Sequence, residues 1–206
     1  MSQQLPPPVN VNTEVVRPLF DNIAFISIFM IAMITMRLFA EEKKMMTIEL
    51  LFTSPITNFQ TIMGKFLAGY LLYCTMLLPT VVYFIILVIF GNPEILPIVT
   101  AYLGLMLIGA VLTSVGLLVS SFTSNQLVAV ALSFGIFLFL WVIDWPADII
   151  GNTTVGSILK YISLPAHFND FTKGVIDSSH IIYYISLVAL SLFLTFRSLE
   201  SMKWRS

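Results

Sequence analysis

Apolar runs of about twenty residues constrain this chain more strongly than any other feature. The hydrocarbon core of a bilayer is about 30 Å thick, and roughly 20 apolar residues in an α-helix cross it. Five stretches of the sequence fit that requirement: residues 19–39, 66–90, 97–119, 126–143 and 181–196. The sequence therefore predicts an all-α, polytopic integral membrane protein, with residues 1–18 as a polar tail before a transmembrane domain over residues 19–206.

The composition agrees with this fold class and excludes several functions. Apolar residues make up 58% of the chain and charged residues 10%, whereas soluble proteins carry about 25% charged residues. The 10 basic and 11 acidic residues give a net charge of −1, which excludes a basic nucleic-acid-binding protein. A single cysteine, Cys74, leaves no disulfide framework and no cysteine-based zinc site.

The basic residues are divided unevenly between the two sides of the expected spans. Seven fall on one side (Arg37, Lys43, Lys44, Lys65, Arg197, Lys203, Arg205) and three on the other (Arg17, Lys160, Lys173). Because the more basic side faces the cytoplasm, we expect a multi-pass protein of the cell inner (plasma) membrane with a cytoplasmic C-terminus. The tail would then be external, and it reads as a loop after a missing first span.

The most polar stretch between spans covers residues 40–60. Its charges come first, and then Met45, Ile48, Leu51 and Phe52 recur at helical spacing, which predicts an amphipathic helix at the inner interface. Ser54-Pro55 should end this helix, and Thr57 with Gln60 fits a capping box for the next one. The stretch is either an ordinary interfacial helix with solvated charges or a docking element for a cytoplasmic partner.

The external stretch 144–180 is too long for a plain connection and too polar to cross the membrane. We expect two short amphipathic helices within 155–175 that dip into the outer leaflet. The only histidines, His167 and His180, lie in this stretch, and the spans carry no catalytic constellation and no metal motif. We therefore expect no enzymatic activity, no metal site and no cofactor in this chain.

Two sets of residues inside the spans admit two interpretations each. Tyr70, Tyr73, Thr75 and Thr80 on the second span could line a translocation pathway or hydrogen-bond between helices, with Pro79 introducing a kink. Gly104, Gly109, Ala110, Ser114 and Gly116 on the third span favour close helix packing, with a translocation surface as the alternative.

Several short motifs resemble those of a known family. They are residues 37–43 (RLFAEEK), 47–51 (TIELL), 53–56 (TSPI) and 64–67 (GKFL), together with 116–123 (GLLVSSFT) and Asn125-Gln126. This pattern resembles the permease subunits of type-2 ABC exporters, and most of all the gliding-motility-type branch. In that family residues 40–60 would form the coupling helix against an ATPase subunit, and the five spans would correspond to spans two to six.

The resemblance implies a function and a set of coupling residues: Glu41, Glu42, Thr47, Glu49, Leu50, Leu51, Ser54 and Pro55. The chain would form half of the membrane pathway of an ATP-driven exporter. ATP and Mg²⁺ would bind to a separate ABC ATP-binding subunit, and a second permease chain would complete the transporter in the lipid bilayer. The alternative is a non-transporting scaffold or motility-complex subunit that recruits an ATPase.

One position departs from the family pattern. The family usually has a glycine directly before the TIELL run, where this chain has Met46. Glycine costs about 1 kcal/mol in a helix interior, so we expect Met46 to stiffen the coupling helix.

Overall fold

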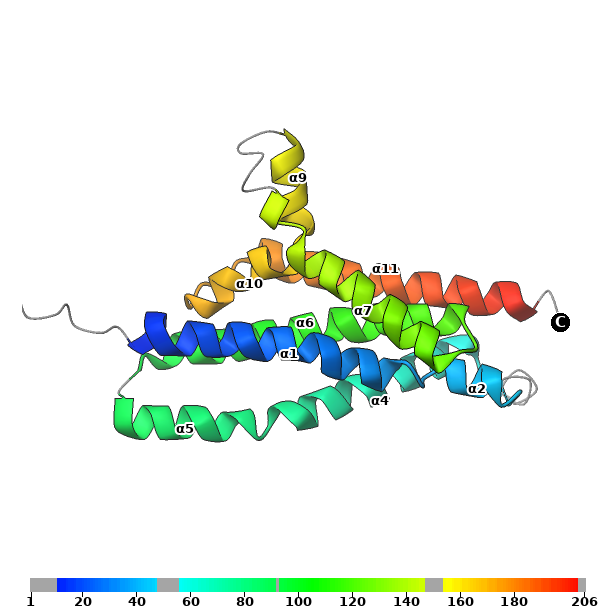
Figure 1. The fold of residues 1–206 in the computed structure, drawn as a ribbon, viewed down its shortest axis with the longest axis horizontal. Coiled ribbons are helices and arrows are strands. Elements are labelled where there is room, and N and C mark those ends of the chain that lie inside the picture. Colours follow the sequence, from blue (N-terminus) through cyan, green and yellow to red (C-terminus); the bar gives the residue numbers. More distant parts are fainter. Residues whose placement is uncertain (1–10, 48–55, 92, 147–153, 204–206) are drawn as a thin grey trace, which may run out of the picture.

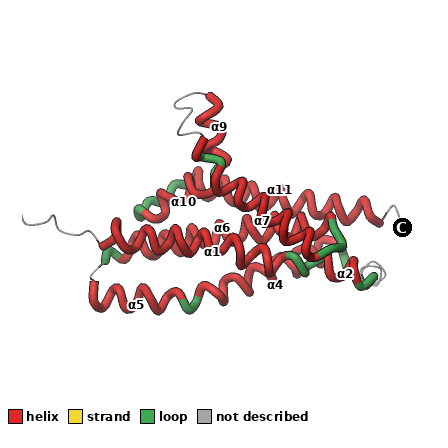
Figure 2. Tube along the Cα trace, viewed as in Figure 1, coloured by secondary structure: helices red, strands yellow, loops and turns green. Residues whose placement is uncertain are grey.

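The computed structural model describes residues 11–47, 56–91, 93–146 and 154–203, with the side chains of the last part described to Ser201. Long helices run side by side along one axis, and the described residues include no β-strand (Figures 1 and 2). One end of the bundle, called here the α2 end, carries α2, the start of α4, the last turn of α6 and the end of α11 (Figure 1). The start of α1, the start of α6 and α10 lie toward the opposite end.

The helices follow the apolar runs of the sequence. A π-helical turn, η1 (Asn12–Val16), leads into α1 (Arg17–Thr35), and α2 (Ala40–Lys44) follows. Next come α4 (Asn58–Leu77), α5 (Thr80–Gly91), α6 (Ile95–Phe122) and α7 (Gln126–Val142). The chain ends with α9 (Thr154–Ile162), α10 (Leu164–Thr172) and α11 (Ser178–Lys203).

Within the described part of the chain, four helical stretches are long and apolar enough to cross a membrane: Asn12–Lys44, Asn58–Gly91, Ile95–Phe122 and Ser178–Ser201. The remaining predicted span, residues 126–143, forms α7, a shorter apolar helix of 17 residues. At 1.5 Å per residue α7 is about 25 Å long, close to the shortest helices that span a bilayer. The predicted all-α, polytopic membrane fold is confirmed.

α6 is the central helix, in contact with α1, α4, α7, α10 and α11. Three of its glycines permit the closest approaches. A β-carbon on Gly109 would overlap the ring of Tyr73, and one on Gly116 would overlap the side chain of Thr35. A β-carbon on Gly104 would lie 2.9 Å from the ring of Phe168. The interpretation of these glycines as helix-packing positions is confirmed.

The second span begins earlier than its apolar run and contains a break. α4 starts at Asn58 under the predicted capping box, in which Gln60 N donates to Thr57 Oγ1 (3.3 Å) and Thr57 N donates to Gln60 Oε1 (3.0 Å). The helix is interrupted at Leu78–Pro79, because proline lacks the N–H that would continue the backbone ladder. The predicted cap and the predicted kink are both confirmed.

The helix expected to run through Met45 ends instead at Lys44. Thr47 N donates to Glu42 O (3.0 Å) and Met46 N donates to Lys43 O (3.3 Å), while Met46 has φ 55°. These bonds define a Schellman ending, whose left-handed position is usually glycine. The expectation that Met46 stiffens a continuous helix is therefore wrong: Met46 occupies the position that terminates α2, where a glycine would be less strained.

The two short helices expected within 155–175 are present as α9, which starts at Thr154, and α10, which ends at Thr172. Ser163 Oγ caps α10 by accepting from Ala166 N (3.3 Å), and Gly174 (φ 86°) ends it. Phe168 and Phe171 of α10 are fully buried against α6, whereas α9 projects away from the bundle (Figure 1). α10 thus belongs to the core, and α9 presents Ile158 and Tyr161 outward.

Candidate functional site

The start of α2 is capped by a residue from a distant helix. Ser120 Oγ, on the last turn of α6, accepts hydrogen bonds from the backbone N–H groups of Phe39 and Ala40, both at 3.0 Å, and donates to Met36 O at 3.2 Å. The first N–H groups of a helix have no partner within that helix, and Phe39 at the cap position offers no side-chain acceptor. Ser120 therefore fastens the turn between α1 and α2 to α6.

Two lysines add further connections to α2. Lys65 Nζ of α4 lies 2.5 Å from Glu42 Oε1 and donates to Leu38 O at 2.5 Å, and it also lies over the ring of Phe39. The side chains of Lys65 and Glu42 are only 18% and 29% exposed, so water screens this ion pair less than a surface pair. Lys43 Nζ donates to Ser121 O of α6. α2 is thus tied to both α4 and α6.

The described coupling candidates occupy different environments. Glu41 is exposed on α2, while Glu42 is half-buried and paired with Lys65. Thr47 is exposed, and its Oγ1 donates to Glu42 O (3.3 Å). The remaining candidates, Glu49, Leu50, Leu51, Ser54 and Pro55, lie outside the described residues. Within α2, only Glu41 offers a carboxylate to a partner, because Glu42 already has an internal one.

Two of the four pathway candidates make contacts between helices. Tyr73 is fully buried, and its hydroxyl lies 3.1 Å from Ser27 Oγ of α1 and 3.3 Å from Leu105 O of α6. Thr80 Oγ1 lies 2.9 Å from the hydroxyl of Tyr102 on α6. These contacts correspond to the interhelical hydrogen-bonding interpretation.

The other two pathway candidates make local contacts. Tyr70 is half-buried and stacks on Phe66, with ring centroids 5.9 Å apart. Thr75 is exposed and donates to Leu72 O within α4.

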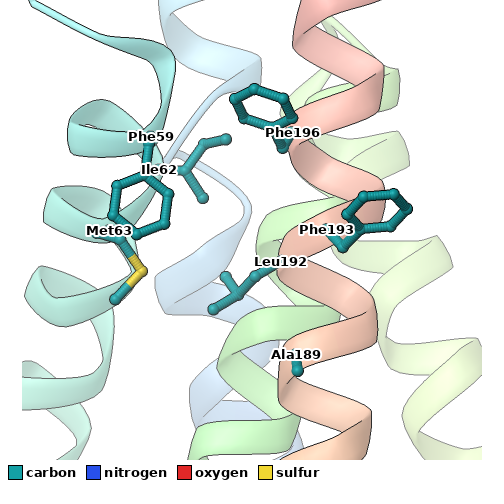
Figure 3. A pocket seen from close by; sticks show the side chains of 7 residues that line it. All are labelled: Phe59, Ile62, Met63, Ala189, Leu192, Phe193 and Phe196. Carbon is teal, nitrogen blue, oxygen red and sulfur yellow. The ribbon is translucent and has the colours of Figure 1, made fainter.

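An apolar groove lies between α4 and α11 (Figure 3). It has a volume of about 500 Å³ and is lined by Phe59, Ile62, Met63, Ala189, Leu192, Phe193 and Phe196. Its lining offers no polar side chain, so it suits hydrocarbon groups and performs no chemistry. Sequence reasoning did not find it because its two walls are more than a hundred residues apart in the chain.

The polar residues at the end of α6 and in the short loop before α7 serve several helices. Asn125 caps α7 by accepting from Leu127 N (2.9 Å), with Thr123 Oγ1 supporting Asn125 N (3.1 Å). Ser120, however, caps α2, and Ser121 Oγ reaches Ser198 Oγ of α11 (3.2 Å). The loop region therefore joins α2, α6, α7 and α11 at one end of the bundle.

The bundle and this braced end define a multi-pass α-helical membrane protein with a short helix fixed to the end of its core. Residues 9–197 match the family model of the ABC-2 family transporter proteins. The chain belongs to this family and is a permease component of an ABC transporter. No curated protein matches the sequence.

Proposed function

We propose that this chain is the membrane half of an ATP-driven exporter and that the segment from α2 to the start of α4 couples it to a separate ATP-binding subunit. The observation that carries this proposal is the bracing of α2 by Ser120 from α6 and by Lys65 from α4. A displacement of a short helix is transmitted to a bundle only if the two are joined by contacts that hold in both states. These bonds supply such a connection to two spanning helices.

The other components of the transporter lie on separate chains. ATP and Mg²⁺ bind to the partner subunit, a second permease chain completes the pathway, and this chain contributes no catalytic residue. We place the α2 end on the cytoplasmic side of the cell inner membrane, in accord with its excess of basic residues. The finer assignment to the gliding-motility-type branch rests on the sequence motifs alone.

The ion pair between Glu42 and Lys65 offers a direct test of transmission through α2. Purified transporter would be reconstituted as wild type, Glu42→Lys, Lys65→Glu and the double exchange, and ATPase activity would be measured with and without the permease. Each single change places two like charges at a half-buried site and should uncouple ATPase stimulation, while the double exchange should restore it. Residues in one ion pair show coupling energies of about 0.5–3 kcal/mol in such cycles.

The exposed pair of Arg197 and Glu200 on α11 (3.0 Å) provides the matched control. Its reversal should leave coupling unchanged, since exposed pairs contribute about 0–1 kcal/mol. Equal ATPase stimulation in all four Glu42 and Lys65 forms would refute transmission through α2.

Docking on the partner is tested by Glu41→Lys and Glu49→Lys. If these carboxylates meet basic residues of the ATP-binding subunit, each change should reduce co-purification of that subunit, because breaking a buried interfacial charge pair costs about 2–5 kcal/mol. Equal recovery together with equal transport would contradict the coupling assignment. Stimulated ATPase activity without movement of any substrate would instead support the scaffold or motility-complex alternative.

A further inference from the structure

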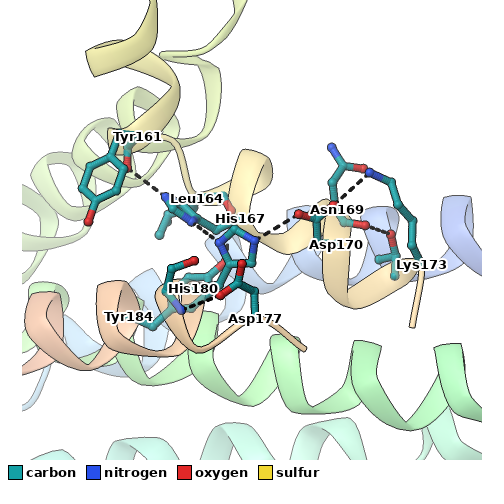
Figure 4. Close-up of polar contacts among 11 residues, drawn as sticks. Tyr161, Leu164, His167, Asn169, Asp170, Lys173, Asp177, His180 and Tyr184 are labelled. Carbon is teal, nitrogen blue, oxygen red and sulfur yellow. Dashed lines mark hydrogen bonds and ion pairs between the residues drawn. The ribbon is translucent and has the colours of Figure 1, made fainter. Parts of the chain in front are cut away.

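The two histidines of the chain, 13 residues apart, meet ring to ring where α10 joins α11 (Figure 4). His167 Nδ1 and His180 Nδ1 lie 2.7 Å apart. On its far side His167 Nε2 lies 2.9 Å from Tyr161 O, the carbonyl near the end of α9. His180 Nε2 lies 3.0 Å from Asp170 Oδ2 of α10. The result is a single chain of hydrogen bonds through both rings.

The groups at the two ends of this chain of hydrogen bonds determine which outer ring nitrogens carry hydrogen. A backbone carbonyl and a carboxylate only accept hydrogen bonds, so the Nε2 atoms of His167 and His180 must both carry hydrogen. The bond between the two Nδ1 atoms then needs one hydrogen. Three of the four ring nitrogens are therefore protonated, and the pair carries one positive charge.

The surroundings of the two rings differ, and His180 is the ring with a carboxylate beside it. Its ring faces the carboxylate of Asp170, whose pKa is lowered by hydrogen bonds from Lys173 and from His180 itself, although partial burial opposes the shift. His167 is only 6% exposed, and burial lowers its pKa below the ordinary 6.5, assisted by the nearby charge of His180 and opposed by the Tyr161 carbonyl and Asp170. Burial therefore disfavours a charge on His167.

We propose that His167 and His180 form a proton-binding site in which one shared proton holds α10 and the end of α9 onto the start of α11. Removal of that proton leaves two facing lone pairs on the Nδ1 atoms, and addition of a second proton leaves two facing N–H groups. Either change breaks the central bond. The attachment is therefore strongest when the pair holds one extra proton, and it weakens on both sides of that pH range.

Charged and aromatic side chains surround the histidine pair. The charged neighbours are Asp170 of α10, Lys173 directly after α10 and Asp177 before α11, while α6 and α7 contribute no charged residue. Tyr161 of α9 and Tyr183 and Tyr184 of α11 pack around His167, with the ring of Tyr183 stacked on it at 4.0 Å.

Two of these tyrosines add tethers that do not depend on the shared proton. The hydroxyl of Tyr183 donates to Ile162 O (2.5 Å), and that of Tyr184 donates to Leu164 O (3.0 Å). Loss of the shared proton should therefore loosen α10 without unfolding the bundle.

His167 determines how the stability of the attachment changes as the pH falls. A histidine whose pKa is lowered in the folded state binds fewer protons there than when unfolded, so stability is retained above its unfolded pKa and lost as the pH falls below about 6.5. On the alkaline side the shared proton leaves, and its hydrogen bond is lost as the pH rises. Because one proton is gained or lost on each side of this pH range, the equilibrium constant for local opening of α10 changes by at most about tenfold per pH unit.

Because the chain has two histidines, ring-nitrogen NMR of histidine-labelled protein in nanodiscs reports on this pair alone. We expect a pH range near 6.5 with three protonated ring nitrogens, and a through-bond coupling between the two Nδ1 atoms. Two rings that titrate independently, with no three-proton state and no coupling, would overturn the proposal.

Hydrogen exchange of the α10 amides provides the functional readout. In the wild type, opening of α10 should increase from pH 6.5 to pH 5, whereas His167→Gln should lose this pH dependence. Glu200→Gln, near the other end of α11, is the matched control and should keep the wild-type profile. Identical profiles for wild type and His167→Gln would also overturn the proposal, and the wild-type NMR decides the question if the variant does not fold.

Discussion

The ring of Tyr73 lies directly against the bare backbone of Gly109, so closely that a single β-carbon at that position would overlap it. The contact joins α4 to the middle of α6. It also places the tyrosine hydroxyl between Ser27 of α1 and Leu105 O of α6, so one aromatic side chain connects three helices.

Replacement of Gly109 by alanine should therefore destabilise the bundle by about 1–3 kcal/mol, the usual cost of overpacking a core. Gly135 of α7 provides the matched control, because a β-carbon there meets no atom within 4 Å. Gly135→Ala should leave the midpoint of thermal unfolding unchanged or raise it, since alanine is the better helix former. Equal midpoints for Gly109→Ala and wild type in detergent would show that the contact does not constrain the fold.

Ser120→Ala should loosen the attachment of α2 to α6. The change leaves the N–H groups of Phe39 and Ala40 without their acceptor, and loss of a helix cap costs about 1–2 kcal/mol. Exchange of those two amides should accelerate. Ser201→Ala is the control, because its hydroxyl donates only to Ser198 O on the same helix. Unchanged protection of Phe39 and Ala40 in Ser120→Ala would mean that water replaces the cap without cost.

Met46→Gly should stabilise the end of α2. Met46 has φ 55° and is 78% exposed, so the change loses little packing while removing backbone strain. The left-handed conformation costs about 1–2 kcal/mol for a residue with a β-carbon, partly offset by the greater flexibility of glycine in the unfolded chain. Met45, at φ −84°, is the control. Met45→Gly should be neutral or destabilising, and an equal gain from both changes would exclude backbone strain as the cause.

The membrane orientation can be tested with cysteines at two exposed lysines, Lys173 beside α10 and Lys44 at the end of α2. In a Cys74→Ser background, an impermeant thiol reagent should label Lys173→Cys in intact cells and Lys44→Cys only after lysis. These sites report more clearly than Lys43 or Lys65, which are half-buried and hydrogen-bonded. Labelling of position 44 from outside would reverse the assignment.

The local features of this fold follow from the sequence because their causes are local. Apolar runs locate the spans, and Thr57 and Gln60 of the capping box lie within one helical turn. Pro79 interrupts the backbone hydrogen bonds of its helix because it has no N–H group. The glycines of α6 were also recognisable as packing positions, although the sequence did not reveal which partners they would meet.

The contacts that hold α2 were less predictable, because they join residues that are distant in the sequence. Ser120 and Phe39 are 81 positions apart, and their hydrogen bond depends on how α1 and α6 pack. The pairing of Glu42 with Lys65 spans 23 positions and removes from the surface a carboxylate that charge alone suggested was free. At Met46 a helix-propensity argument failed because the residue lies at the end of a helix and not within one.

The close packing of α6 has a mechanical consequence. Its three bare positions each hold a different neighbour: Phe168 of α10, Tyr73 of α4 and Thr35 of α1. Rotation of α6 about its axis would drive bulky side chains into all three, so the helix can only move together with them. From Ser120 to Gly104 is 16 residues, or about 24 Å along the axis. If the proposed partner displaces α2, we expect α6 to carry that displacement to the neighbourhood of α10 as a rigid helix, with little bending.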